Sequence, residues 1–317
     1  MPFQAHVFRQ GRNYNATYCC PWCCCTRDEA GDVTDHPSWL CTMGVPPWPE
    51  DEPPPLTAVP GLDQPQSSRP DIFHIGPLGV CRDLYLGGIL ILIHLSHFLS
   101  SDGSRALDSK LKSAFKNFKQ FCQEIHETPT VKEWTKENFR RTSAGAYPDC
   151  SFKASDAHLI LKWLENYLNS GPWRDDEGVL ELLLTAVGNV NRFYRTCYTA
   201  PSRQWLYEAN ALAATSSLQL FFSSYYSLAQ WAYDHEICLF RFTPKFHAFK
   251  HVHLALLKEQ SRGKPGKRWT HNPAMYATAN DEDFIGKVSR PCRILHSGSA
   301  ELRRLEIYRV ELCKAWV

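Results

Sequence analysis

Two cysteines separated by two residues, Cys20 and Cys23, form the most specific chemical pattern in this sequence. Two thiolates at this spacing can bind one tetrahedral zinc ion from a tight turn. A complete site needs two more ligands. Cys41, His36, Cys24, Cys25 and the distant His74 are all candidates, of which we predict His74 and Cys41. Plain structural or reactive thiols remain an alternative. So does a redox role, although no strand-helix-strand pattern surrounds the CxxC.

Asp71 and His74 form a DxxH pattern directly before the most apolar stretch of the chain. Such a pair can supply a metal ligand, an acid and a base, or a carboxylate that orients an imidazole. The simpler alternative is an aspartate that caps a helix beside a histidine at the edge of the core. The pattern alone leaves these alternatives open.

A second histidine pattern places His247 and His251 one helical turn apart. Two imidazoles on one helical face can bind a metal ion. Because the intervening residues do not form HExxH, a metalloprotease is not indicated. The helix could instead present its Lys and His side chains to phosphate, or carry ordinary solvated histidines.

Basic residues are concentrated near the C-terminus. The segment 261–268 contains Lys264, Lys267 and Arg268 without an acid, which suits contact with a phosphate backbone. It lacks the P-loop pattern. A solvated loop is the alternative interpretation.

A run of three acids, Asp281 to Asp283, precedes Lys287, Arg290 and Arg293. Acids at a helix start interact favourably with the helix dipole. The same carboxylates could help to hold Mg²⁺. The three bases after them are further candidates for nucleic-acid contact.

Composition indicates a folded protein with an uneven charge distribution. The 317 residues are 44% hydrophobic, and the formal net charge is only +2. Residues 240–317 carry 15 basic and 7 acidic residues, a net charge of +8, whereas residues 1–80 carry 4 and 9. This asymmetry favours an anionic partner for the C-terminal quarter, with DNA as the first candidate. Thirteen cysteines without an apolar leader predict an intracellular protein, in the nucleus if DNA is its partner.

The elements that must position these residues are mainly helical. The stretch 84–99 is almost wholly apolar and predicts a buried core helix. At 16 residues it is short for a bilayer, which needs about 20, so we predict no membrane association. Helical periodicity recurs over 104–235, and strand-like runs are restricted to 237–242 and 267–277. We therefore predict a mostly α (α+β) fold with a small strand component.

Composition divides the chain into four predicted segments. Residues 1–43 are a Cys-rich, zinc-binding segment, and residues 44–70 are a linker with nine of the 21 prolines. Residues 71–236 are a helical domain, and residues 237–317 are a basic C-terminal segment.

The order of these motifs resembles that of CACTA-type (En/Spm-like) DDE transposases. In that family a CxxC and then a DxxH precede a helical insertion, which here resembles residues 104–235. The resemblance implies that the few strands are a remnant of an RNase H-like sheet. It also implies that Glu282 corresponds to the last catalytic glutamate, with Mg²⁺ as the cofactor if the chain is catalytic. The family's two catalytic aspartates lie before the CxxC, so we expect a catalytically incomplete protein.

The leading functional prediction is a transposon-derived protein that retains nucleic-acid binding. One alternative is a helical interaction or scaffold protein, with the aromatic region 217–231 as its partner face or as core. A second alternative is a metal-dependent nuclease or transposase completed by another chain. If the chain is cut out of a larger fold, exposure of the apolar helix would lead to self-association.

Overall fold

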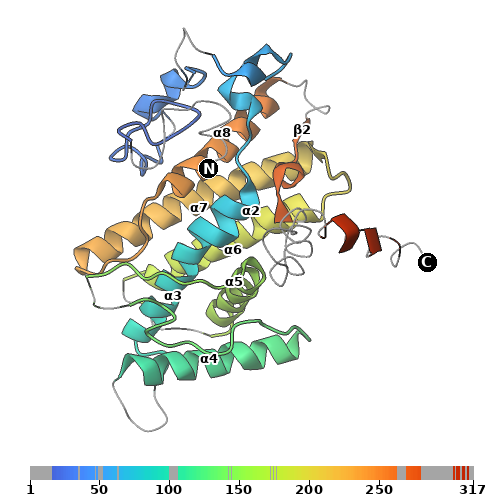
Figure 1. The fold of residues 1–317 in the computed structure, drawn as a ribbon. Coiled ribbons are helices and arrows are strands. Elements are labelled where there is room, and N and C mark those ends of the chain that lie inside the picture. Colours follow the sequence, from blue (N-terminus) through green and yellow to red (C-terminus); the bar gives the residue numbers. More distant parts are fainter. Residues whose placement is uncertain are drawn as a thin grey trace. The chain divides into compact units, whose positions relative to one another are not determined.

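The computed structural model describes most of the chain between residues 16 and 279. The described residues are 16–34, 36–46, 48, 53–62, 64–99, 106–141, 143, 145–171, 173, 175, 177–262 and 269–279, with single positions 303, 305–307, 309, 310 and 313. They form a mostly helical protein with one small antiparallel sheet, which confirms the predicted fold class (Figure 1). The chain divides into two compact units, Met1–Tyr276 and Ala277–Val317.

The predicted core helix lies at the centre of the first unit. It consists of α2 (Ile72–Ile75), one π-helical turn at Gly76–Val80, and α3 (Cys81–His94), in direct succession. The backbone is therefore helical through Gly76-Pro77, and the helical run begins well before the predicted residue 84. It ends at His94 rather than Leu99, because Ser96 adopts a left-handed conformation with a φ of 62°.

The stretch Ile72–His94 has the length and apolar composition of a membrane-crossing helix, but 89% of its apolar window is buried inside the protein. Other helices pack directly against it. The Phe240 ring lies so close to Gly87 that a Cβ atom there would overlap it. A helix buried to this extent by its own protein is a core helix.

Five longer helices surround this centre. They are α4 (Leu107–Glu124), α5 (Ala154–Asn169), α6 (Val179–Tyr198), α7 (Glu208–Asp234) and α8 (Pro244–Arg262). Helices α6 and α7 lie side by side along much of their length (Figure 1). In α4 the buried side chains recur at three- and four-residue spacing, as its amphipathic pattern predicts.

The aromatic region 217–231 belongs to α7 and mostly contributes to the core. Phe221, Phe222 and Tyr225 are fully or almost fully buried, whereas Leu220 and Tyr226 are exposed. The core alternative predicted for this region is therefore the one that the structure supports.

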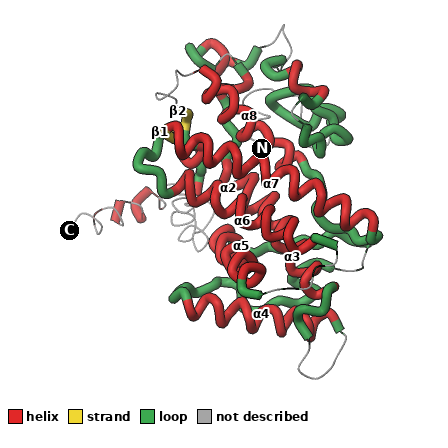
Figure 2. Tube along the Cα trace, turned by 180° about the vertical axis from the view of Figure 1, so that it is seen from behind, coloured by secondary structure: helices red, strands yellow, loops and turns green. Residues whose placement is uncertain are grey.

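The sheet consists of two three-residue strands, β1 (Trp205–Tyr207) and β2 (Trp269–His271). They pair antiparallel, with Trp205 opposite His271 and Tyr207 opposite Trp269. Figure 2 shows the pair at one end of the helical body. Strand β2 falls within a predicted strand-like run. The other predicted run, 237–242, was wrong because it forms an irregular connection in which Phe240 has a φ of 55°.

Short 3₁₀ helices complete the described fold. They are Ser38–Thr42, Pro55–Ala58, Pro65–Ser67 and Pro273–Tyr276. The predicted boundaries at residues 43, 70 and 236 all fall within the first compact unit.

Candidate metal centre

The CxxC lies in a tight hairpin-like loop. Tyr18 and Thr26 form an antiparallel bridge, and the Cys19 amide donates to the Cys25 carbonyl over 3.0 Å. Inside the loop, the Trp22 amide donates to the sulfur of Cys20 over 3.3 Å. This turn brings the two sulfurs of the CxxC to one side, as chelation requires.

Helix α8 presents the two histidines. The Thr243 hydroxyl accepts a hydrogen bond from the amide of Phe246, and Pro244 occupies the first helical position, where a missing amide proton is tolerated. Residues four apart share one helical face, so His247 and His251 project together. Both are buried, with exposed fractions of 1% and 4%.

The loop and the helix meet in one cluster of Cys20, Cys23, His247 and His251. All four ligand atoms lie within 4.8 Å of one another. Cys23 Sγ is 3.2 Å from His247 Nε2 and 3.4 Å from His251 Nε2, and Cys20 Sγ is 3.3 Å from His251 Nε2. A zinc tetrahedron with sulfur and nitrogen ligands has edges of roughly 3.3–3.8 Å. The cluster therefore has the size and donor set to hold a metal ion.

The electrostatics favour the metal-binding protonation states of Cys23 and His251, whereas Cys20 favours its protonated thiol while no metal is bound. The pKa of the Cys23 thiol is lowered, chiefly by hydrogen bonds to its sulfur from Cys20 and then Cys25, with smaller contributions from the two imidazoles. Burial raises the pKa of Cys20. Burial also lowers the pKa of His251 and so favours its neutral form. A thiolate and a neutral imidazole are the forms that coordinate metal.

Two tryptophans enclose the cluster. The Trp39 ring lies edge-on to His247 at 4.4 Å, and the Trp22 ring lies 5.6 Å from His251. The Trp22 indole also donates to the carbonyl of Ser68 over 2.5 Å. Further along α8, the Lys250 ammonium donates to the carbonyl of Val33 over 3.1 Å. These contacts exclude water and hold the Cys-rich loop on α8.

The other two predicted metal ligands lie elsewhere. His74 Nδ1 is 2.6 Å from Asp71 Oδ2, and Asp71 Oδ1 accepts a hydrogen bond from the Phe73 amide at the start of α2. Asp71 is thus the helix N-cap that the simpler interpretation of DxxH predicts. Cys41 is exposed, and its thiol donates to the carbonyl of Ser38. His74 and Cys41 were predicted as the third and fourth ligands, but in the structure His247 and His251 are the residues that complete the cluster.

The remaining predicted site residues lie outside the described residues. They are Lys264, Lys267, Arg268, Glu282, Lys287, Arg290 and Arg293.

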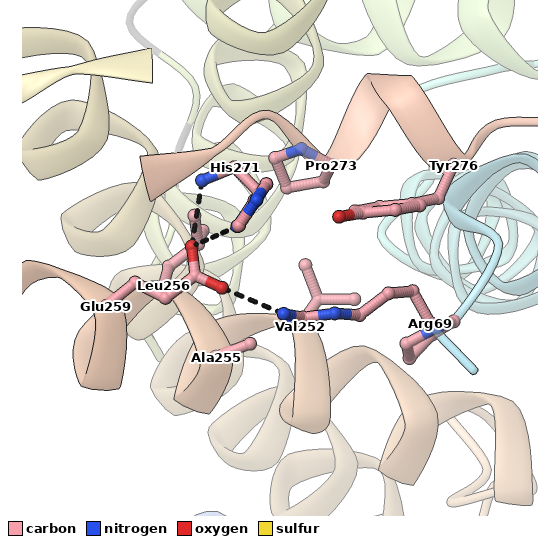
Figure 3. A pocket seen from close by; sticks show the side chains of 9 residues that line it. Arg69, Val252, Ala255, Leu256, Glu259, His271, Pro273 and Tyr276 are labelled. Carbon is pink, nitrogen blue, oxygen red and sulfur yellow. Dashed lines mark hydrogen bonds and ion pairs between the residues drawn. The ribbon is translucent and has the colours of Figure 1, made fainter. Parts of the chain in front are cut away.

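A small pocket lies near the C-terminal end of α8. Glu259 spans its floor, with one carboxylate oxygen 3.0 Å from Arg69 and the other accepting from the His271 amide. Tyr276 closes the opposite side, and the walls are apolar (Figure 3). Because Glu259 contacts both Arg69 and His271, it connects the chain before α2 to α8 and β2.

The histidine pair was visible in the sequence, but its partnership with the CxxC was not. The CxxC and the histidine pair each supply two of the four ligands of a zinc site, and together they make up a Cys₂His₂ site. That complementarity is the signal that could have joined them.

No protein-family model matches this chain, and no curated protein and no solved structure matches it. The resemblance to CACTA-type transposases therefore rests on the motifs alone.

Proposed function

We propose that this chain is a zinc-stabilised, transposon-derived helical protein that binds DNA through its basic C-terminal quarter and is catalytically incomplete. The observation that carries the proposal is the buried Cys₂His₂ cluster. Zinc is the metal that this donor set favours, because thiolates and imidazoles together suit zinc and four protein ligands close a structural site.

The position of the cluster connects it to the proposed DNA contact. The zinc ligands His247 and His251 belong to α8, which ends at Arg262, and the basic residues Lys264, Lys267 and Arg268 follow within six positions. A metal that holds α8 on the Cys-rich loop would also hold the C-terminal end of α8, where the basic segment begins. The net charge of +8 over residues 240–317 supports an anionic partner.

The proposal assigns no catalysis to Glu282. Two-metal strand transfer requires several carboxylates that converge on two ions about 4 Å apart. The zinc ligand set contains no carboxylate, and Asp71 is engaged by His74 and by a backbone amide. A metal-binding role for Asp71 would require it to leave these partners.

Fluorescence anisotropy with a labelled DNA duplex tests the proposed binding. The full chain should bind DNA with an affinity that falls between about 50 mM and about 200 mM salt, because phosphate contacts release counterions. Alanine at Lys264, Lys267 and Arg268 together should weaken binding and reduce the salt slope by about 2 to 3. The matched control places alanine at Lys112, Lys116 and Lys119, which are exposed on α4. The control removes the same charge and should leave DNA binding nearly unchanged.

Two outcomes would contradict the proposal. DNA affinity that is absent or insensitive to salt would remove the nucleic-acid role and favour the scaffold alternative. Mg²⁺-dependent nicking of supercoiled DNA that disappears in Glu282→Gln would establish a nuclease, with its missing carboxylates supplied by another chain.

A further inference from the structure

One face of the two-stranded sheet consists entirely of aromatic rings. Side chains alternate between the two faces of a strand, and the register places Trp205 opposite His271 and Tyr207 opposite Trp269. These four rings therefore share one face. Leu206 and Thr270, on the other face, have exposed fractions of 0% and 1%.

The aromatic face is open to solvent. Tyr207 is 56% exposed and Trp269 is 52% exposed, and the His271 side chain is 38% exposed. Trp205 lies edge-on to Trp269 at 4.1 Å and packs against His271 at 4.5 Å. Trp205, Trp269 and His271 form one cluster of rings, and Tyr207 lies on the same face opposite Trp269. Figure 2 shows β1 and β2, which carry these residues, at one end of the helical body. A contiguous aromatic surface of this kind on a folded chain marks a binding site.

Hydrogen bonds hold the backbone of the two strands in place. The Asn272 amide donates to the Gln204 carbonyl over 2.8 Å, and the Asn272 side chain donates to the Cys197 carbonyl over 2.8 Å. Glu259 of α8 accepts from the backbone amide of His271 and lies 3.1 Å from its ring nitrogen. The aromatic face is thus attached to the helix that carries the metal cluster, and its rings are held in place before a ligand arrives.

Basic residues flank the two strands in the sequence. Arg203, two residues before Trp205, and Arg262, at the end of α8, are both exposed. In the sequence, Lys267 and Arg268 directly precede Trp269. Aromatic rings with nearby cations recognise unpaired nucleotides, since bases stack on the rings while cations contact the phosphates. A paired duplex keeps its base faces stacked and cannot use such a surface.

We infer that Trp205, Tyr207, Trp269 and His271 form a stacking platform for unpaired bases of single-stranded nucleic acid. This inference rests on the proposed DNA binding and deepens it, because it separates base stacking on the sheet from phosphate contact by the basic segment. The platform takes any base, since every base offers a π-face.

Three labelled probes of equal length test the inference by anisotropy with the full chain. They are single-stranded oligo(dT), an abasic strand that keeps the phosphates but lacks bases, and a duplex. The wild type should bind oligo(dT) more tightly than the abasic strand. Trp269→Ala should weaken oligo(dT) binding by about tenfold, the effect of one lost base–ring contact, and should leave the abasic and duplex affinities unchanged.

Matched variants separate stacking from misfolding. Trp269→Phe keeps an aromatic ring and should retain most of the oligo(dT) affinity. Tyr207→Ala should lower it, whereas Tyr233→Ala, which removes a 78% exposed tyrosine from α7, should not. Circular dichroism on each variant should show the wild-type helix content, because the substituted side chains are largely exposed.

The remaining outcomes distinguish a loss of all DNA binding from a loss of base stacking alone. If no probe binds, the proposed DNA binding fails and the platform fails with it. If the duplex binds and oligo(dT) affinity does not depend on the aromatic residues, the platform alone is overturned. Sedimentation that shows a dimer dissociated by Trp269→Ala, with unchanged oligo(dT) affinity, would also overturn it and assign the face to a second copy of the chain.

Discussion

The Sγ atom of Cys23 lies 3.2 Å from Nε2 of His247, although 224 positions separate the two residues in the chain. A metal bound here would close a loop that contains the central helix and most of the helices packed on it. Closing a long loop restricts the unfolded chain, and metal affinity for a folded site adds directly to its stability. A metal at this cluster would therefore couple its binding to folding of the whole first unit.

Loss of one metal ligand should lower both metal content and stability. We expect about one zinc ion per wild-type chain by mass spectrometry of the metal, and far less in Cys23→Ser or His251→Gln. A decrease of several kcal/mol in the free energy of unfolding should lower the Tm by roughly 10 °C, since about 1 kcal/mol corresponds to about 2–4 °C for a unit of this size. A strong chelator should reproduce this shift in the wild type and have little effect on the variants.

Cys41→Ser and His74→Gln are the controls for the ligand set. Neither residue belongs to the cluster, so both variants should retain the metal. Zinc loss in either variant, with full zinc in His251→Gln, would contradict the ligand set described here.

The sequence predicted the fold class and half of the cluster for clear physical reasons. Helical periodicity locates amphipathic helices such as α4, and an apolar stretch locates the buried helix. The CxxC spacing identifies Cys20 and Cys23, because their chelation is local. The pairing of Cys23 with His247 is set by tertiary packing across more than 200 residues, which local spacing cannot encode.

Strand β1 was missed for a similar reason. Trp205, Leu206 and Tyr207 lie directly before a long helical pattern, and three residues are too few to show strand alternation. Their strand exists because β2 pairs with it, with Leu206 buried beneath. The π-helical turn at Gly76-Pro77 also depends on context, since the Tyr194 hydroxyl occupies the space beside Gly76.

Gly87 and Gly188 should respond oppositely to substitution by alanine. At Gly87 a Cβ atom would overlap the ring of Phe240, which is 2% exposed and cannot move away easily. Gly87→Ala should therefore destabilise the protein by about 1–3 kcal/mol, the usual result of overpacking. At Gly188 the nearest atom to a Cβ is Glu165 Oε1 at 3.5 Å, an ordinary contact. Gly188→Ala should stabilise α6 by about 0.5–1 kcal/mol.

Urea denaturation of the two variants measures both effects. Equal destabilisation by both substitutions would show that the overlap with Phe240 does not determine the loss of stability at Gly87.

Asp83 should be essential for packing the segment after α7 onto the central helix. It is 4% exposed, and Arg241 donates to its Oδ1 from Nε over 3.1 Å and from Nη2 over 3.0 Å. Burial raises the pKa of Asp83, and the hydrogen bonds from Arg241 oppose this rise. Asp83→Asn should lower the free energy of unfolding by roughly 3 kcal/mol, because it leaves the Arg241 guanidinium with only the more distant carboxylate of Asp149, at 3.7 Å.

The double variant Asp83→Leu with Arg241→Met provides the comparison for this pair. Because it removes both charges, it should be more stable than Asp83→Asn in the same urea titration. If the double variant loses as much free energy of unfolding as Asp83→Leu and Arg241→Met lose separately when added together, the two residues act independently.

His158 should make the protein less stable in acid. Burial, with a smaller contribution from Lys162, lowers the pKa of this imidazole to about 4, whereas the unfolded value is about 6.5. Between these values the unfolded chain binds more protons, so stability falls as the pH decreases from about 6.5 to about 4 and this contribution then levels off. At 1.36 kcal/mol per pKa unit the full loss is at most about 3 kcal/mol.

His158→Phe should flatten this part of the stability profile, since Phe keeps an aromatic ring against Tyr194, whose ring lies 5.1 Å from that of His158. The measurement is the free energy of unfolding in urea at several pH values, taken as the difference between wild type and variant. Acid release of metal from His247 and His251 affects both proteins and cancels in that difference. His126→Asn is the control, because this exposed position has a φ of 58° that asparagine tolerates. A pH profile for His158→Phe parallel to that of the wild type would show that acid sensitivity originates elsewhere.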